Sequence, residues 1–136
     1  LAASDVPTPY DGSDVIIAGA EQLQEELATG EGMLVVFWAP WCGHCHTVAP
    51  AVKEAATELK ASGVRVAAMD GQQNPRTAAH LGVRGYPTIM WLQSVKQESG
   101  ESALAVGNYN GARDAASIVK FAQAAHAASG LKSKLP

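Results

Sequence analysis

Residues 37–45 read FWAPWCGHC, an apolar run that breaks at Pro40 and brings two cysteines, three positions apart, to the start of a predicted helix. They are the only cysteines in the chain. A helix N-terminus exposes unpaired backbone N–H groups and the positive end of the helix dipole, and both stabilise a thiolate on the first cysteine. Cys42 is therefore the predicted nucleophile. Cys45, one helical turn later, is close enough to form a disulfide with Cys42 and is predicted to be the shielded partner.

The cysteine pair has four possible interpretations. A disulfide that closes so short a loop stabilises the fold very little. A purely structural role is therefore poorly supported, and a redox role is favoured. Residues 42–46, CGHCH, also match the CxxCH signature of covalent haem attachment, but no segment stands out as the source of the second axial ligand. Zinc needs four ligands, and the separate His80 and His126 do not form a second paired site.

Length and charge limit the possible functions of the chain. Its 136 residues are enough for one domain with a single core, and the formal net charge is −3. Acidic and basic residues are interspersed, which argues against nucleic acid or an anionic membrane surface as the main partner. No apolar run approaches transmembrane length. The chain starts at Leu1 rather than at a methionine, which is typical of a processed or excised product.

Hydrophobic periodicity predicts strands that alternate with helices. An unbroken apolar run at 33–37 indicates a central strand buried on both faces, and Pro50 predicts a kink in the helix that follows the cysteines. The predicted strands are 15–17, 33–37, 64–69, 88–92 and an edge strand at 103–106; the predicted helices are about 19–29, from the cysteines to Gly63, 75–81 and 114–128.

This pattern is typical of an α/β fold with a central mixed sheet and helices on both faces. Residues 1–13 contain Pro7, Pro9 and Gly12, so we expect an irregular leader there rather than a packed element. The domain itself is expected to occupy residues 14–130, and residues 131–136 are expected to form a polar tail.

Three stretches of the chain resemble a known family. Residues 38–45, WAPWCGHC, followed by Ala49-Pro50, resemble the active-site segment of the thioredoxin superfamily, and the Gly-His pair is similar to its protein disulfide isomerase branch. Residues 82–88, GVRGYPT, resemble the cis-proline loop of that family, and 109–113, YNGAR, the stretch before the last helix of isomerase catalytic (a-type) domains. These matches occur in family order, and the resemblance spans residues 33 to about 128. The resemblance implies the thioredoxin fold.

The resemblance also implies the roles of four catalytic residues. Cys42 would attack or be attacked, and Cys45 would resolve the mixed disulfide. His44 would stabilise the Cys42 thiolate by hydrogen bonding or charge. Arg113 would approach Cys45 and lower its pKa when the mixed disulfide has to be resolved.

A second group of residues would bind the substrate. Pro87, in cis, would face the disulfide and leave the backbone around Tyr86 free to pair with an extended substrate. Trp41 would frame the substrate surface. Arg84, beside Pro87, is equally compatible with a plain surface position and with substrate contact.

The chain departs from the family pattern at two positions. The family usually has a buried Asp or Glu on the central strand, which relays a proton for the buried cysteine; the matching residue here is Val36. The residue after the second cysteine is usually basic in the isomerases, and here it is His46, whose charge depends on pH. The chain also lacks a KDEL-type ending, so retention in the endoplasmic reticulum does not follow from its sequence.

From these features we expect a thiol–disulfide oxidoreductase and isomerase that needs no cofactor and no metal. Its expected partners are cysteine-containing proteins, with glutathione or an upstream oxidase as redox partner, and we expect it to be monomeric in the endoplasmic reticulum lumen or elsewhere in the secretory pathway. Two alternatives stay open. The chain could be the thioredoxin module of a larger sulfhydryl oxidase, or a client-binding chaperone module whose cysteines turn over poorly.

Overall fold

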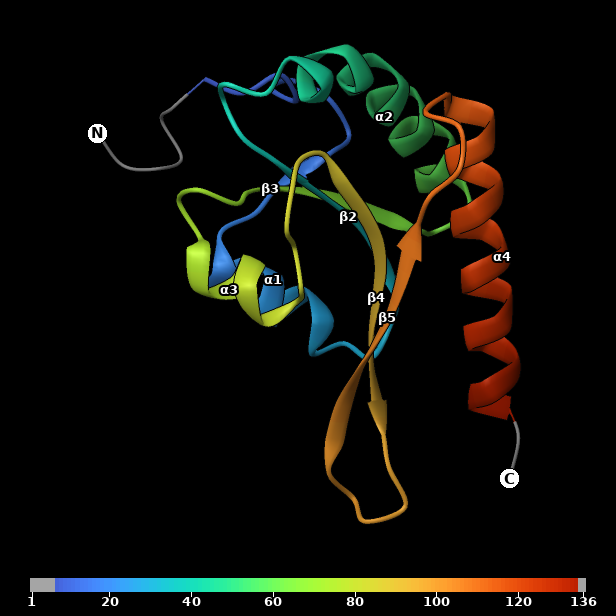
Figure 1. The fold of residues 1–136 in the computed structure, drawn as a ribbon. Coiled ribbons are helices and arrows are strands. Elements are labelled where there is room, and N and C mark those ends of the chain that lie inside the picture. Colours follow the sequence, from blue (N-terminus) through green and yellow to red (C-terminus); the bar gives the residue numbers. More distant parts are fainter. Residues whose placement is uncertain (1–6, 135–136) are drawn as a thin grey trace.

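Five strands form one mixed sheet at the centre of the molecule, with helices on both of its faces (Figure 1). The structure is a computed structural model that describes residues 7–134, with side chains described as far as residue 128. Its elements are β1 (Ile16–Ile17), α1 (Ala20–Leu27), β2 (Met33–Trp38), α2 (Gly43–Ala61), β3 (Arg65–Asp70), α3 (Pro75–His80), β4 (Thr88–Lys96), β5 (Ser102–Tyr109) and α4 (Ala115–Lys134). The predicted α/β architecture is therefore confirmed.

The strand order β1-β3-β2-β4-β5 places β2 in the middle of the sheet. β2 pairs in parallel with β3 and antiparallel with β4, so that Val36 lies opposite Ala68 on one side and Ile89 on the other. Every residue of β2 is buried. A strand covered on both faces needs apolar residues at every position rather than at alternate ones, which explains its sequence MLVVFW.

Each face of the sheet carries its own apolar core. α2 and α4 cover one face, where Val52 and Ile118 are fully buried, and α1 and α3 cover the other, where Leu23 packs with residues of β2, β3 and β4 (Figure 1). Cys42 and Cys45 belong to the core on the α2 side. This packing fixes the N-terminus of α2 against the end of β2, and α2 continues through Pro50 without ending there.

β4 and β5 are longer than the sequence predicts. They pair antiparallel from Ile89 opposite Tyr109 to Lys96 opposite Ser102, and their far ends project as a hairpin beyond the body of the sheet (Figure 1). The residues of this projecting part are exposed or half-buried. Because backbone pairing rather than core burial holds them, hydrophobic periodicity gives little sign of their extent.

α4 is also longer than predicted. It continues to Lys134, past the expected end at residue 128, so residues 131–134 of the expected polar tail are helical. Residues 135–136 lie outside the described residues. The alanine-rich sequence of this helix has high intrinsic helix propensity, and polar residues alone do not end a helix.

The leader is irregular in its described part, residues 7–13, but it is packed. Tyr10 is fully buried, and its ring meets the ring of Trp38 edge-on with the centroids 6.3 Å apart. Asp11 accepts hydrogen bonds from the amide and hydroxyl of Thr8 at 3.0 and 2.8 Å, which hold the turn around Tyr10. The backbone of this segment is irregular, as expected, but the Tyr10 side chain still joins the core, because an aromatic side chain can pack there from an irregular backbone.

Candidate active site

The turn after β2 places Cys42 at the N-terminus of α2. β2 ends at Trp38, and the amide of Cys42 donates a hydrogen bond to the carbonyl of Ala39 at 3.1 Å, which closes a turn around Pro40. Cys42 is the N-cap residue of α2, and its sulfur accepts the backbone N–H of Cys45 at 3.1 Å. The sulfur therefore lies where a helix end stabilises negative charge.

Cys42 and Cys45 form a disulfide across the first turn of α2, with their Cα atoms 5.2 Å apart. Cys42 is 5% exposed to solvent, whereas Cys45 is fully buried. The difference in burial favours Cys42 as the sulfur that an incoming thiolate reaches.

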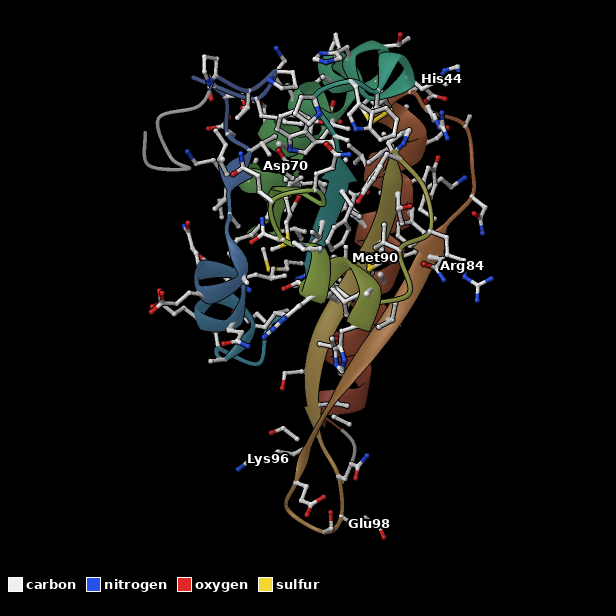
Figure 2. All side chains as sticks on the ribbon, turned by 60° about the vertical axis from the view of Figure 1, so that its left-hand side comes forward. His44, Asp70, Arg84, Met90, Lys96 and Glu98 are labelled. Atoms are coloured by element: carbon white, nitrogen blue, oxygen red, sulfur yellow. A yellow bond between two sulfur atoms is a disulfide. The ribbon has the colours of Figure 1, made fainter. Side chains whose placement is uncertain are left out.

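The two histidines at the start of α2 have different surroundings. His44 is exposed, and Figure 2 shows it at the beginning of the helix. The Nε2 atom of His46 lies 2.8 Å from the carbonyl oxygen of Pro40, and its ring meets the ring of Trp38 edge-on with the centroids 6.5 Å apart. Because a carbonyl oxygen only accepts hydrogen bonds, Nε2 is the protonated nitrogen. His46 therefore helps to hold the turn that carries Cys42.

The loop before β4 brings the predicted substrate-binding residues together. The Tyr86–Pro87 peptide bond is cis, as the resemblance implies. The ring of Tyr86 meets the ring of Trp41 edge-on with the centroids 6.0 Å apart, and Trp41 is 65% exposed. Tyr86 also lies against Gly71, where a Cβ atom would come within 2.2 Å of the tyrosine hydroxyl. The contact with Trp41 joins the cis-proline loop to the turn that carries Cys42, and the contact with Gly71 joins it to the turn after β3.

Arg113 lies on the turn between β5 and α4. Together with Arg84 and Pro87 it lines a groove of about 410 Å³ beside the cis-proline. Both arginines are exposed. Arg113 makes no hydrogen bond to Cys45 within the described residues, so its expected approach to Cys45 stays a prediction.

Among the described side chains, the core around the disulfide contains no carboxylate or basic residue. Val36 is fully buried, and no Asp, Glu, His, Lys or Arg is buried among the residues whose side chains are described, 7–128. With valine at position 36, this part of the chain therefore has no buried carboxylate. A proton leaving Cys45 has to travel by water or by a group that reaches in from the surface.

Sequence reasoning missed two residues that shape the site. Tyr10 belongs to the same core as Cys45, its hydroxyl has no hydrogen-bond partner among the described residues, and burial raises its pKa far enough to keep it neutral. The only signal for it is an aromatic residue in a Pro-rich segment. Gly71 leaves room for the ring of Tyr86. Its sequence context, Asp70-Gly71, indicates only a turn after a strand.

A dithiol at the N-terminus of the helix that follows a central strand, together with a nearby cis-proline, defines a thioredoxin-type domain. The sequence profile of the family Thioredoxin matches residues 14–124, and the chain belongs to this family. The fold is accordingly the thioredoxin fold, as predicted.

The sequence relatives include proteins named protein disulfide-isomerase. That of Gallus gallus is 37% identical over 124 residues, which cover 89% of this chain and 23% of the relative. Protein disulfide-isomerase 1 of Caenorhabditis elegans is 35% identical over 123 residues, covering 89% of this chain and 24% of the relative. The chain therefore spans about a quarter of the length of these relatives and is a protein disulfide-isomerase-like thioredoxin domain.

Solved structures from ERdj5 are also similar. The J-Trx1 fragment of ERdj5 has a TM-score of 0.74 and 28% identity, with 88% of this chain and 55% of that chain covered. The Trx4 domain of ERdj5 has a TM-score of 0.70 and 26% identity, with 83% of this chain and 96% of that chain covered. The second match shows that the fold corresponds to one complete thioredoxin domain.

The described residues contain neither a membrane-spanning helix nor a cluster of metal-binding side chains. Among residues 7–134, no helix combines the length and the apolar character needed to cross a membrane. The same part of the chain contains no group of three or more His, Cys, Asp or Glu side chains placed to bind a metal ion.

Proposed function

We propose that this chain is a thiol–disulfide oxidoreductase domain that forms and rearranges disulfides in protein substrates. The observation that carries the proposal is the Cys42–Cys45 disulfide at the N-terminus of α2, in which Cys42 alone retains exposure. The similarity to protein disulfide-isomerases over 89% of the chain supports it. A disulfide that closes so short a loop adds little stability, so its position is better explained by chemistry than by architecture.

Oxidation of a substrate proceeds in two exchanges. A substrate thiolate attacks the sulfur of Cys42, the bond from Cys42 to Cys45 breaks, and Cys45 leaves as a thiolate that takes up a proton. A second thiolate of the substrate then attacks the substrate sulfur of the mixed disulfide, and Cys42 leaves. Two electrons and two protons pass from the substrate dithiol to the Cys42-Cys45 pair. The substrate ends with a disulfide, and the domain ends reduced.

Isomerisation starts from the reduced domain. The thiolate of Cys42 attacks a substrate disulfide, and the released substrate thiolate attacks another disulfide of the same molecule. When the rearranged substrate frees Cys42 again, no net electron transfer has occurred. If rearrangement stalls, Cys45 loses its proton and attacks Cys42, which releases the substrate reduced and leaves the domain oxidised.

The surrounding residues have supporting roles in this proposal. His44 favours the thiolate of Cys42 and so favours the reduced state. Arg113 assists deprotonation of Cys45 when it swings toward that sulfur. Tyr86 and Pro87 present the backbone against which an extended substrate pairs, and the exposed Trp41 borders that surface.

The proposed compartment is the lumen of the endoplasmic reticulum, or elsewhere in the secretory pathway. Disulfide formation requires an oxidising environment, and the relatives named protein disulfide-isomerase and ERdj5 support this location. Glutathione or an upstream oxidase would reoxidise the pair after each oxidation. We further propose that the domain is monomeric.

Paired cysteine variants test the proposal. With a reduced and unfolded protein as substrate, the parent should restore native disulfides over many turnovers. Cys45→Ser should accumulate a mixed disulfide through Cys42 that persists on a non-reducing gel, because the resolving sulfur is gone. Cys42→Ser should lose turnover and form no such adduct, since Cys45 is fully buried.

Two results would overturn this assignment. In the reduced parent, faster alkylation of Cys45 than of Cys42 would reverse the roles of the two sulfurs. Suppression of substrate aggregation without any turnover would identify a client-binding module instead of an oxidoreductase.

A further inference from the structure

The charged residues that line the groove beside the cis-proline are all basic. Residues 82–89 form one wall, residues 108–113 form the other, and the groove has a volume of about 410 Å³. Arg84 and Arg113 are the charged residues among those that line it, and both are exposed. The chain as a whole carries a net charge of −3, so the groove has the opposite sign to the overall charge. Figure 2 shows Arg84 beside β5 with its side chain directed outward.

Among the described side chains, no acidic residue neutralises these arginines. Asp114, next to Arg113 in sequence, caps α4: its carboxylate accepts hydrogen bonds from the amide of Ser117 at 2.8 Å and from the hydroxyl of Ser117 at 2.9 Å. Within the described residues, neither Arg84 nor Arg113 takes part in a salt bridge or hydrogen bond. Both guanidinium groups therefore keep all their donors for a ligand.

Hydrogen bonds hold the two segments that carry the arginines. The hydroxyl of Thr88 donates to the carbonyl of Gly85 at 2.6 Å, which fixes the loop between Arg84 and β4. The hydroxyl of Tyr109 donates to the carbonyl of Ala112, and the Tyr109 ring packs against another aromatic side chain on α4. The arginines thus extend from ordered turns, which reduces the entropy lost when they bind a ligand.

We propose that this groove binds an acidic side chain of the substrate, so that the domain selects cysteines with Asp or Glu close by in sequence. The inference rests on the proposed function, because the substrate cysteine has to be held at Cys42 while its neighbour reaches the groove. Pro87 lines the groove and follows Tyr86, which contacts Trp41 next to Cys42. The groove is therefore continuous with the surface that an extended substrate would cross.

Guanidinium and carboxylate groups match in geometry as well as in charge. Arginine donates two parallel hydrogen bonds to one carboxylate, which a lysine cannot do. Because both arginines are exposed, each ion pair is weak, and we expect the two together to give a preference of about fivefold. The preference should decrease with ionic strength, since salt screens exposed charges.

A set of matched peptides tests the inference. Each peptide carries two cysteines and differs only in having Glu, Gln or Lys at one position on either side of the first cysteine. The measurement is kcat/KM for oxidation of each peptide at low and at high salt. At one or more positions the Glu peptide should be oxidised about fivefold faster than the Gln peptide at low salt, and the ratio should approach one at high salt.

Substitutions at Arg84 assign the preference to the groove. Arg84→Gln should lower the Glu-to-Gln ratio toward one while leaving oxidation of the Gln peptide unchanged, and Arg84→Lys should keep part of the ratio. Arg84→Glu should favour the Lys peptide. Arg76→Gln is the matched control, because Arg76 is an exposed arginine on α3 that lines a different groove, and it should keep the full preference.

The possible failures are distinguishable. Equal rates for Glu and Gln peptides at every position would overturn the inference, and so would a preference that survives in Arg84→Gln. Equal slowing of both peptides by Arg84→Gln would also overturn it, since an anion site has to discriminate between them. Failure of the parent to oxidise any peptide would reject the proposed function itself.

Discussion

At the scale of single residues, Val36 stands where the family resemblance leads us to expect a buried carboxylate. Release of a trapped substrate requires Cys45 to lose a proton in a core that contains no buried Asp, Glu, His, Lys or Arg among residues 7–128. With Val36 in place, the proton has to leave by water or with the help of Arg113. The resolving step should therefore be slow. In return, valine packs well on a central strand, where a buried carboxylate is costly to desolvate.

Val36→Glu tests this account of resolution. The variant should lose on the order of 1 to 3 kcal/mol of unfolding free energy, because a polar, ionisable group replaces a fully buried valine on β2 and has to be desolvated. It should release mixed disulfides faster near neutral pH, up to about 100-fold if the carboxylate acts as a general base. Stopped-flow resolution rates and urea midpoints measure the two effects. Val36→Gln, which is similar in shape but cannot accept the proton, is the control; equal resolution rates in parent and Val36→Glu would show that proton removal is not limiting.

Gly71 controls the substrate surface without taking part in the chemistry. A Cβ atom at this position would lie 2.2 Å from the hydroxyl of Tyr86, so Gly71→Ala has to displace the ring that contacts Trp41. We expect a loss of about 1 to 3 kcal/mol in stability and a raised KM for peptide substrates, with the reaction toward a small thiol such as glutathione nearly unchanged. Gly19→Ala is the control, since a Cβ atom there meets nothing within 4 Å. An unchanged KM for peptides in Gly71→Ala would exclude this positioning role.

Residue-level predictions from the sequence were strong where a motif was involved and weak elsewhere. The cysteine pair, the cis-proline and the absence of a carboxylate at Val36 could all be predicted, because each belongs to a short local pattern. Tyr10 and Gly71 could not be predicted. Their importance depends on which distant side chain packs against them, and no local pattern encodes that.

At the scale of elements, the N-terminus of α4 shows how one carboxylate sets the start of a helix. Asp114 accepts hydrogen bonds from the backbone N–H and the hydroxyl of Ser117, and these bonds lower its pKa below the ordinary value of 3.8. A carboxyl whose pKa is lower in the folded state binds protons more weakly there than in the unfolded chain. Its stabilisation is therefore complete above its ordinary pKa and is lost as the pH falls through the lowered value.

Asp114→Asn isolates this charge, because asparagine can still cap the helix. The variant should be slightly less stable than the parent at neutral pH, and the two melting temperatures should converge as the pH falls below 3.8. Thermal melts from pH 7 to pH 2 measure this. Glu98→Gln, at the exposed tip of the β4–β5 hairpin (Figure 2), is the matched control for loss of one negative charge. A difference between parent and Asp114→Asn that persists at the lowest pH would mean that side-chain geometry, not charge, is responsible.

The sequence predicts elements well when they are buried and poorly when they are not. β2 and α2 have one-sided or continuous apolar patterns, and the predicted and observed segments agree closely. The far ends of β4 and β5 are held by strand pairing outside the core, and the end of α4 is held by helix propensity. Hydrophobic periodicity reports burial and carries no information about strand pairing outside the core or helix propensity. These elements therefore extend past their predicted limits.

At the scale of the whole molecule, the alternation of strands and helices was sufficient to predict the α/β class, and the three family-like stretches were sufficient to predict the thioredoxin fold. The pattern of single elements does not encode their strand order, β1-β3-β2-β4-β5. That order determines that the N-terminus of α2, the cis-proline loop and the turn before α4 lie at one end of the sheet. The charged groove beside Pro87 exists only because of this arrangement.

The whole fold also couples the redox state to stability. The disulfide closes a short loop, so it restricts the unfolded chain very little and adds little stability by that route. The thiolate of Cys42, in contrast, gains from the N-terminus of α2 only when the helix is folded. Reduction should therefore be easier in the folded domain than in the unfolded chain. By thermodynamic linkage, the folded domain should then be more stable when it is reduced.

We accordingly expect the reduced domain to unfold at a higher urea concentration than the oxidised domain. The difference in unfolding free energy should be about 1 to 3 kcal/mol, where 1.4 kcal/mol corresponds to roughly 30 mV in reduction potential. His44→Pro removes the side chain expected to favour the thiolate, so it should narrow the difference and lower the potential by the equivalent amount. Urea unfolding with and without dithiothreitol, together with equilibration against glutathione, gives both quantities independently. The double variant Cys42→Ala/Cys45→Ala controls for direct effects of the reductant and should unfold at the same midpoint in both conditions. A lower midpoint for the reduced parent would mean that the helix terminus does not stabilise the thiolate enough to make this domain an oxidant.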